Sequence, residues 1–284
     1  MLTLDHLGYV AAALPPLREA FTKLGFALTA PRELQAVAAD GRPRSLGQQS
    51  CHAVFAHGYL EFTAVADAGP THHLAPWLAA TPRVAILALG CEDAEAARAS
   101  ASARGVALGP VADAVREVDY GARAGTARFR WCALPAADTP ESLVCLVQHR
   151  DALRVFQPEV QRHPNGARAL AGLEWHLPTA QFARALERYA ALLGVSARRD
   201  TDDAWRFSLG YESIVLRLAS KATAATATVV IEVADLALAR ACLQRNGVRY
   251  AECDAGLEIA AESAGGAAMR LAVVYPRDSQ NLGK

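Results

Sequence analysis

Apolar and polar residues follow one another along the chain in a pattern that predicts strands and helices in a definite order. Residues 2–12 are predicted to form a strand, and residues 14–26 a helix with leucine and phenylalanine side chains on one face. Residues 51–65 read as two strands that turn at His57 and Gly58. The first part of the chain therefore has the order strand, helix, strands.

The same order recurs three more times. New units begin near residues 83, 170 and 226. The second module has predicted strands at 83–90, 127–136 and 142–149 and a helix at 92–106. The third has strands at 170–179, 205–211 and 213–219 and a helix at 180–194. The fourth has strands at 226–233 and 269–275 and a helix at 234–248. The sequence thus predicts an α+β protein with four modules of the order βαβββ.

A boundary is predicted between the second and third modules. This stretch has no clean period and carries Pro158, Pro164 and the turn signal Asn165-Gly166. The predicted organisation is a first pair of modules over residues 1–151, a linker over 152–168, and a second pair over 169–284. The second pair is shorter, which leaves less room for loops over a cavity.

Composition excludes several classes of partner. Of the 284 residues, 52% are hydrophobic, which is ample for a buried core. Lysine plus arginine and aspartate plus glutamate both number 29, so no net charge attracts nucleic acid or an anionic membrane. Small-molecule partners are favoured instead. No long uncharged apolar run occurs and Asp5 and His6 interrupt the first one, so a cytoplasmic location is expected.

Motifs for the common nucleotide and hydrolase sites are missing from the sequence. It contains no GxSxG, no GxxxxGK[ST], and no GxGxxG after a predicted strand. The six cysteines are scattered without CxxC spacing, which favours buried free thiols over disulfides or a zinc cluster.

Two strands carry residues with possible site chemistry. In a strand, alternate side chains share a face, so His6 lies with Gly8, and Glu61 lies with Tyr59 and Thr63. A neutral imidazole nitrogen and a carboxylate oxygen together are ligands that divalent iron, manganese, nickel or zinc accepts. The structural alternative is a hydrogen-bonded core histidine and a glutamate paired with an arginine. Both interpretations stay open at this point.

Three stretches resemble a known group of proteins. An opening LDHLGYV at residues 4–10, a helix ending in LGF, and GYLEF at residues 58–62 resemble the glyoxalase-like families of the vicinal-oxygen-chelate superfamily, which also include extradiol dioxygenases and bleomycin-resistance-like proteins. The stretch at residues 148–173 is similar to one branch of those families. The resemblance implies that paired modules form curled mixed sheets, an open cup with its helices outside.

The resemblance also implies where a metal would be bound, on the first and last strands of each module. The corresponding positions here are His6, Glu61, the apolar Ala85 or Ile86, and Gln148, although His149 could face inward in place of Gln148. A divalent metal is thus one expectation, and a metal-free cup is an equal one. The pocket is expected to be lined by His52, Tyr59, Thr63, Tyr120, Phe129 and Trp131.

Three hypotheses for function follow. The first is a metal-dependent lyase, isomerase or dioxygenase acting on a small carbonyl or aromatic compound, with Glu61 as ligand or as a general base whose pKa burial raises. The second is a metal-free protein that binds or sequesters a small molecule. The third is a structural protein whose cup is filled by its own side chains. A homodimer formed through edge strands is also expected.

The second pair of modules is expected to lack a complete site of its own. Glu174 and His176 share one face of a predicted strand, but Arg270 or Ala272 stands where a carboxylate would be needed. We therefore expect the second pair to be degenerate, serving to close the cup or to form a dimer face.

Overall fold

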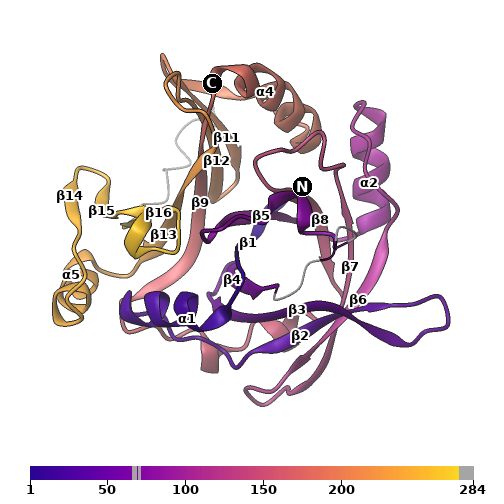
Figure 1. Ribbon diagram of the computed structural model, residues 1–284, viewed down its shortest axis with the longest axis horizontal. Helices are drawn as coiled ribbons and strands as arrows, with labels where there is room; N and C mark the ends of the chain where they lie inside the picture. The colour runs from indigo at the N-terminus through magenta and orange to yellow at the C-terminus, as the bar shows by residue number, and fades with distance from the viewer. Residues whose placement is uncertain (66–68, 70–71, 275–284) are drawn as a thin grey trace, which may run out of the picture.

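The first eight strands form a closed barrel. The computed structural model describes residues 1–65, 69 and 72–274. Neighbouring strands follow the order β1-β4-β3-β2-β6-β7-β8-β5, and β5 pairs again with β1 (Figure 1). The strands are β1 (Thr3–Ala11), β2 (Arg32–Val37), β3 (Pro43–Val54), β4 (Tyr59–Ala64), β5 (Arg83–Gly90), β6 (Ala112–Val118), β7 (Gly125–Ala133) and β8 (Leu143–His149).

The barrel closes through two antiparallel seams between its halves. On one side β1 pairs with β5, with His6 opposite Ala88, and on the other β2 pairs with β6, with Leu34 opposite Arg116. The sequence predicted an open cup here, and that prediction is wrong for this sheet because both seams are paired. Closure leaves no free strand edge in the barrel.

Helices α1 (Leu14–Lys23) and α2 (Ala94–Ala103) lie outside the barrel. Prolines occupy the first turn of α1, where a missing N–H group costs nothing, and the buried face presents Leu14, Leu17 and Phe21. The carboxylate of Asp93 accepts a hydrogen bond of 2.8 Å from the N–H group of Ala96 and so caps α2.

The second half of the chain forms an open sheet. Its order is β10-β11-β12-β9-β13-β16-β15-β14. The strands are β9 (Ala167–Leu177), β10 (Arg198–Thr201), β11 (Ala204–Leu209), β12 (Glu212–Leu218), β13 (Thr226–Val233), β14 (Ala251–Cys253), β15 (Gly256–Ile259) and β16 (Ala268–Ala272), with helices α4 (Thr179–Leu193) and α5 (Leu236–Arg245) and the short turn η3 (Ala261–Ser263). The fold is therefore α+β with two mixed sheets. The predicted strand over 269–275 ends earlier, and residue 275 lies outside the described residues.

The connection between the sheets is held against the barrel. It contains α3 (Ala152–Val155) and η2 (Pro158–Val160). Farther on, His163 accepts a hydrogen bond of 3.1 Å from the N–H group of Ala27 and lies 2.9 Å from the carbonyl oxygen of Val54. The amide of Asn165 donates to the carbonyl oxygen of Leu24 at 3.0 Å. These contacts hold the predicted linker against the first half of the chain.

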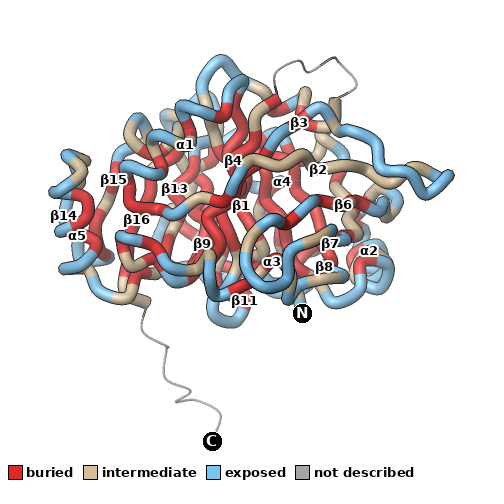
Figure 2. The backbone as a smooth tube through the Cα atoms, turned by 90° about the horizontal axis from the view of Figure 1, so that it is seen from below, coloured by how far each residue is buried: buried red, intermediate tan, exposed pale blue. Residues whose placement is uncertain are grey.

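The two sheets share one apolar core. Buried residues of both halves form a single cluster, and Figure 2 shows them running along the strands through the middle of the molecule. A buried ion pair joins Glu141, between β7 and β8, to Arg188 on α4, and the Tyr189 hydroxyl donates to Glu141 at 3.0 Å. No helix within the described residues is long and apolar enough to cross a membrane.

Candidate functional site

The barrel interior contains a cavity with two chemically different sides. Its empty volume, mouth included, is about 660 Å³. The polar side comes from the first four strands and the loop that follows them, with His6, Gln48, Ser50, Glu61 and His73. The opposite side comes from the other strands and is mainly apolar, with Ile86, Phe129, Trp131, Leu143, Cys145 and Val147. Such a cavity fits a small molecule that has one polar and one apolar end.

His6 lies at the polar side and is held on three sides. Its ring stacks on Tyr59 with 4.4 Å between ring centroids, and its Nδ1 lies 2.7 Å from Oδ1 of Asp5. The other ring nitrogen, Nε2, lies 3.3 Å from Oε2 of Glu61. The pairing of β1 with β5 shifts register between Leu4 and His6, so β1 is irregular where its two adjacent polar residues meet.

One carboxylate oxygen of Glu61 is engaged by two hydroxyl groups. Oε1 accepts hydrogen bonds from the hydroxyls of Ser50 at 2.7 Å and Thr63 at 2.6 Å. Oε2 faces His6. Because Ser50 lies opposite Thr63 on the neighbouring strand, both hydroxyls reach the same oxygen. The carboxylate is therefore fixed in one orientation, with one oxygen directed to the imidazole.

These contacts make His6 and Glu61 an ion pair at neutral pH. Burial alone would lower the pKa of His6, but its hydrogen bonds to Asp5 and Glu61 and their negative charges raise it to about 9. Burial alone would raise the pKa of Glu61, yet the hydrogen bond and charge of His6 hold it well below its usual range. The raised pKa expected for Glu61 from its burial is thus wrong, because the neighbouring imidazolium outweighs desolvation.

His149, and not Gln148, faces the interior. Nε2 of His149 lies 2.9 Å from Oδ2 of Asp5, which continues the polar chain from Glu61 through His6. The amide of Gln148 instead donates to the carbonyl oxygen of Glu92 at 2.7 Å, and its oxygen accepts from the N–H group of Ala94. The placement of Gln148 with His6 and Glu61 is therefore wrong, because strand alternation turns it outward onto the start of α2.

The other expected pocket residues divide into two groups. Tyr59, Phe129 and Trp131 line the cavity. Thr63 lies behind Glu61 as its hydrogen-bond donor, and Tyr120 bonds through its hydroxyl to the carbonyl oxygen of Val155 at 2.9 Å, so neither is among the lining residues. His52 faces the barrel interior on the same side as Ser50 and Glu61, but its ring packs against Tyr59 and it is not among the lining residues. Its ring contacts Arg116, and burial, followed by the charge of that arginine, lowers its pKa well below the usual range.

Five polar residues of the site were not anticipated from the sequence, and two of them, Gln48 and His73, line the cavity. Asp5 bridges two histidines, Ser50 bonds to Glu61, and Arg116 reaches the cavity from β6. Ala114, Arg116 and Val118 alternate in a short segment and are all buried, which is the period of a strand. That alternation was the available signal for β6 and for an arginine that faces inward.

The donor atoms do not make up a complete metal site. His6 and Glu61 supply one nitrogen and one oxygen, whereas a catalytic zinc site takes three protein ligands. On the other half of the barrel the cavity is lined by Ile86 on β5 and by Cys145 and Val147 on β8. Within the described ranges, no group of three or more histidine, cysteine, aspartate or glutamate residues could hold an ion. The residues present therefore do not fit a metal held by the protein alone.

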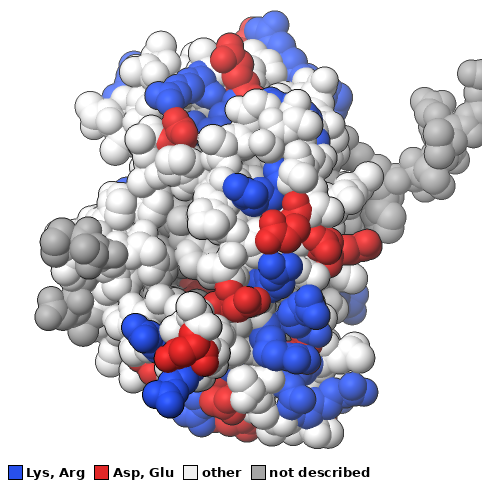
Figure 3. Space-filling model, turned by 90° about the vertical axis from the view of Figure 1, so that its right-hand side faces the viewer, with Lys and Arg blue, Asp and Glu red and all other residues white. Residues whose placement is uncertain are grey.

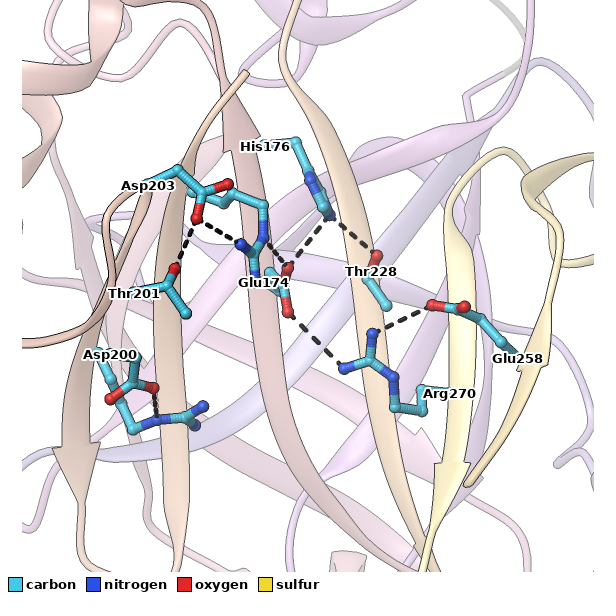
Figure 4. A network of polar contacts seen from close by, with 10 residues as sticks. Glu174, His176, Asp200, Thr201, Asp203, Thr228, Glu258 and Arg270 are labelled. Carbon is cyan, nitrogen blue, oxygen red and sulfur yellow. Dashed lines mark hydrogen bonds and ion pairs between the residues drawn. The ribbon is translucent and has the colours of Figure 1, made fainter. Parts of the chain in front are cut away.

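The second sheet carries a separate polar network (Figure 4). Oε1 of Glu174 accepts a hydrogen bond of 2.7 Å from Nε of Arg217, and Oε2 lies 3.7 Å from Nη1 of Arg270. His176 lies 3.1 Å from the hydroxyl of Thr228. Glu174 is thus occupied by two arginines, and the expected pair of Glu174 and His176 forms part of a network of ion pairs.

Comparison with known sequences places the chain in a family. The sequence profile of the glyoxalase-like domain matches residues 4–193. The chain therefore belongs to the glyoxalase-like domain family, as the resemblance of its opening strand and of GYLEF indicated. The matched region covers the whole barrel and continues to the end of α4. No curated protein sequence matches the chain.

Solved structures share the fold at low sequence identity. A hypothetical protein from Staphylococcus aureus has 11% identity over 96% of this chain and 100% of its own, with a TM-score of 0.66. A xylose isomerase-like TIM barrel/4-hydroxyphenylpyruvate dioxygenase fusion protein has 15% identity over 87% of this chain and 39% of its own, with a TM-score of 0.55. A mutant of 4-hydroxymandelate synthase from Streptomyces coelicolor has 15% identity over 89% of this chain and 78% of its own, with a TM-score of 0.54. These likenesses establish the fold alone.

Proposed function

We propose that the barrel cavity binds a small carbonyl compound and exchanges a proton with it through His6 and Glu61. The observation that carries this proposal is the ion pair facing the cavity, with 3.3 Å between Nε2 of His6 and Oε2 of Glu61. His6 is 8% exposed and Glu61 7%, so bulk water competes weakly for either group. The apolar opposite side accounts for the rest of a ligand of mixed polarity.

The two groups suit complementary roles in enolisation. With its pKa raised to about 9, His6 is protonated at neutral pH and can donate a hydrogen bond to a carbonyl oxygen. When Nε2 of His6 donates to the carbonyl oxygen in place of Oε2 of Glu61, that carboxylate oxygen is released to take a proton from the carbon beside the carbonyl. The electron pair of the broken C–H bond then moves toward the oxygen that His6 stabilises. Returning the proton to a different carbon gives isomerisation, and expelling a leaving group gives lyase chemistry.

Asp5 serves as a positioning residue in this scheme. Its Oδ1 contacts Nδ1 of His6 at 2.7 Å, which directs the proton on Nε2 toward the cavity. Its Oδ2 lies beside His149. Since both oxygens are engaged, the His6 ring has one preferred orientation, stacked on Tyr59.

A second candidate is a divalent ion held by His6 and Glu61 with the ligand completing its coordination. Two observations favour it. The separation of 3.3 Å between the two donor atoms is suitable for neighbouring ligands of one ion with bonds of about 2.1 Å. Asp5 also supports the other ring nitrogen, an arrangement common around metal-bound histidines. A metal-free protein that only sequesters its ligand is the third possibility.

Proton exchange and metal content distinguish these functions. The protein is purified without chelator or nickel resin, its metal content is measured, and deuterium uptake from D2O is followed by NMR for a panel of small enolisable carbonyl compounds. We expect no equivalent of metal, catalysed exchange by the wild type, and a loss of about a hundredfold or more in His6→Gln and in Glu61→Gln. The exposed His57 provides a matched control, because His57→Gln should retain the wild-type rate.

The other outcomes each select an alternative. About one equivalent of iron, manganese, nickel or zinc, lost in both variants, rejects the proposal in favour of the metal-dependent candidate. Ligand binding without exchange in any protein favours sequestration. Undiminished exchange in His6→Gln removes His6 from the reaction. A homodimer and a cytoplasmic location also stay predictions.

A further inference from the structure

Arg116 is the least compensated charge among the described residues of the cavity. It extends from β6, which pairs with β2 and β7, and it is 5% exposed. Its guanidinium carbon lies 5.9 Å from the ring centroid of Tyr59 and 5.6 Å from that of Phe129. The guanidinium thus lies beside two aromatic rings of the barrel interior, and like them it lines the cavity.

Among the described residues, no carboxylate forms an ion pair with Arg116. Its side-chain hydrogen-bond partner is the ring of His52, which carries no charge at neutral pH because burial and Arg116 itself lower its pKa. Nη2 of Arg116 is buried and has no hydrogen-bond partner among the described residues. The carboxylate of Glu61 is already occupied by Ser50, Thr63 and His6, so it does not compensate Arg116.

A buried and unpaired guanidinium destabilises the folded protein. Moving such a charge out of water is strongly unfavourable unless an anion and hydrogen bonds compensate for it. The nearby aromatic rings provide a weaker attraction. Because the free Nη2 belongs to a residue of the cavity wall, the missing partner is expected in the cavity. A carboxylate suits this position, since the planar fork of arginine matches its two oxygens.

We propose that the ligand of the barrel is a small carboxylate whose anionic group binds Arg116. Its apolar body would lie against Phe129, Trp131 and Val147. Tyr59 contacts both Arg116 and His6, so one ring-sized ligand can reach both groups. A carboxylate is favoured over a phosphate because, among the described lining residues, Arg116 is the one lysine or arginine, and a dianion needs more donors. The inference rests on the proposed function only in taking this cavity as the ligand site.

Matched acids and amides test the inference. Benzoate and phenylacetate are compared with benzamide and phenylacetamide by isothermal titration calorimetry, with phenyl phosphate as a further probe. We expect the wild type to bind at least one acid about tenfold or more tightly than its amide. Arg116→Met should reduce that preference to near unity. Arg130 offers a matched control, because it lies outside on β7, paired with Glu95 at 3.1 Å, and Arg130→Met should keep the preference.

Several results would overturn the proposal. They are equal affinity for acid and amide in the wild type, an unchanged preference in Arg116→Met, stronger binding of phenyl phosphate, or no saturable binding of any probe. If Arg116→Met does not fold, Arg116→Gln replaces it, and the wild-type comparison stands without a variant. His6→Gln separates the two proposals. If it retains the acid preference but loses proton exchange, both stand, and if wild type and His6→Gln exchange equally, only the proposed function fails.

Discussion

Replacing Glu61 with glutamine should lower the pKa of His6 and weaken the folded state at neutral pH. In the wild type, Asp5 and Glu61 together overcome burial and raise that pKa from 6.5 to about 9. A shift of this size corresponds to about 3 kcal/mol of stabilisation while His6 is protonated. Glutamine keeps the shape of Glu61 but removes one of the two negative charges beside His6. We therefore expect the free energy of unfolding to fall by roughly 1–2 kcal/mol.

The pH dependence of stability has a definite sign. Because the pKa of His6 is higher in the folded state, its stabilisation is fully present below pH 6.5 and is lost as the pH rises through about 9. In Glu61→Gln the pKa of His6 should be closer to its ordinary value, so the smaller stabilisation from protonated His6 should be lost at a lower pH than in the wild type. At the acid end, the lowered pKa values of Asp5 and Glu61 mean that their contribution is present above about pH 4 and is lost as the pH falls.

Urea unfolding and NMR together provide the measurement. The free energy of unfolding is determined near pH 6 and near pH 10 for wild type, Glu61→Gln and His6→Gln. At each pH the value for His6→Gln is subtracted from that for the wild type, which removes the effect of other titrating groups. That difference should shrink by about 3 kcal/mol in the wild type as the pH rises. The His6 ring signals report its pKa directly. The reasoning is refuted if His6 titrates at the same pH in wild type and in Glu61→Gln.

Two other substitutions test the buried ion pair of Glu141 with Arg188 and the turn at Gly58. Glu141→Gln should destabilise the protein by about 3 kcal/mol or more in urea unfolding, because it leaves Arg188 buried without its carboxylate, whereas Arg184→Gln at an exposed ion pair should cost less than about 1 kcal/mol. An equal effect of the two would argue against this view of the interface. Gly58→Ala should destabilise by about 1 kcal/mol or more, since Gly58 has a φ of +72° and a Cβ there would lie 2.7 Å from the carbonyl oxygen of Asp5. Altered NMR signals of His6 in that variant would show that the turn at Gly58 positions Asp5 beside His6, and unaltered signals would contradict this role of the turn.

The sequence predicted the elements that alternate or repeat strongly. The strand at the start of the chain, the pair turning at Gly58 and the helices beginning near Leu14 and Thr179 lie where the pattern placed them. β2 was missed because all its residues are half-buried, so it shows no alternation of burial. The closed seams could not be predicted either, since pairing between β1 and β5 depends on contacts that a local pattern does not contain.

The sequence predicted the site residues that alternation along a single strand reveals, and it missed those that depend on contacts between distant strands. The alternation around His6 and Glu61 was sufficient to place both on the cavity wall. Two neighbouring polar residues at the end of β8 left the register open, and only the pairing of Phe129 with His149 shows which one faces inward. The contact between Arg116 and His52 joins strands far apart in sequence, so no local pattern could reveal it.

Under the proposed function, the groups that exchange a proton lie in the first half of the barrel and the apolar wall lies in the second. His6, Ser50 and Glu61 come from the first half, whereas Ile86, Leu143 and Val147 come from the second. Substitutions in the second half can alter the size and shape of an accepted molecule while leaving the proton-handling groups untouched. Figure 3 shows acidic and basic side chains intermixed on one outer face, so neither sign of charge dominates that face. A scaffold arranged in this way can acquire new ligands by repacking one wall, which makes that wall the natural target for laboratory evolution.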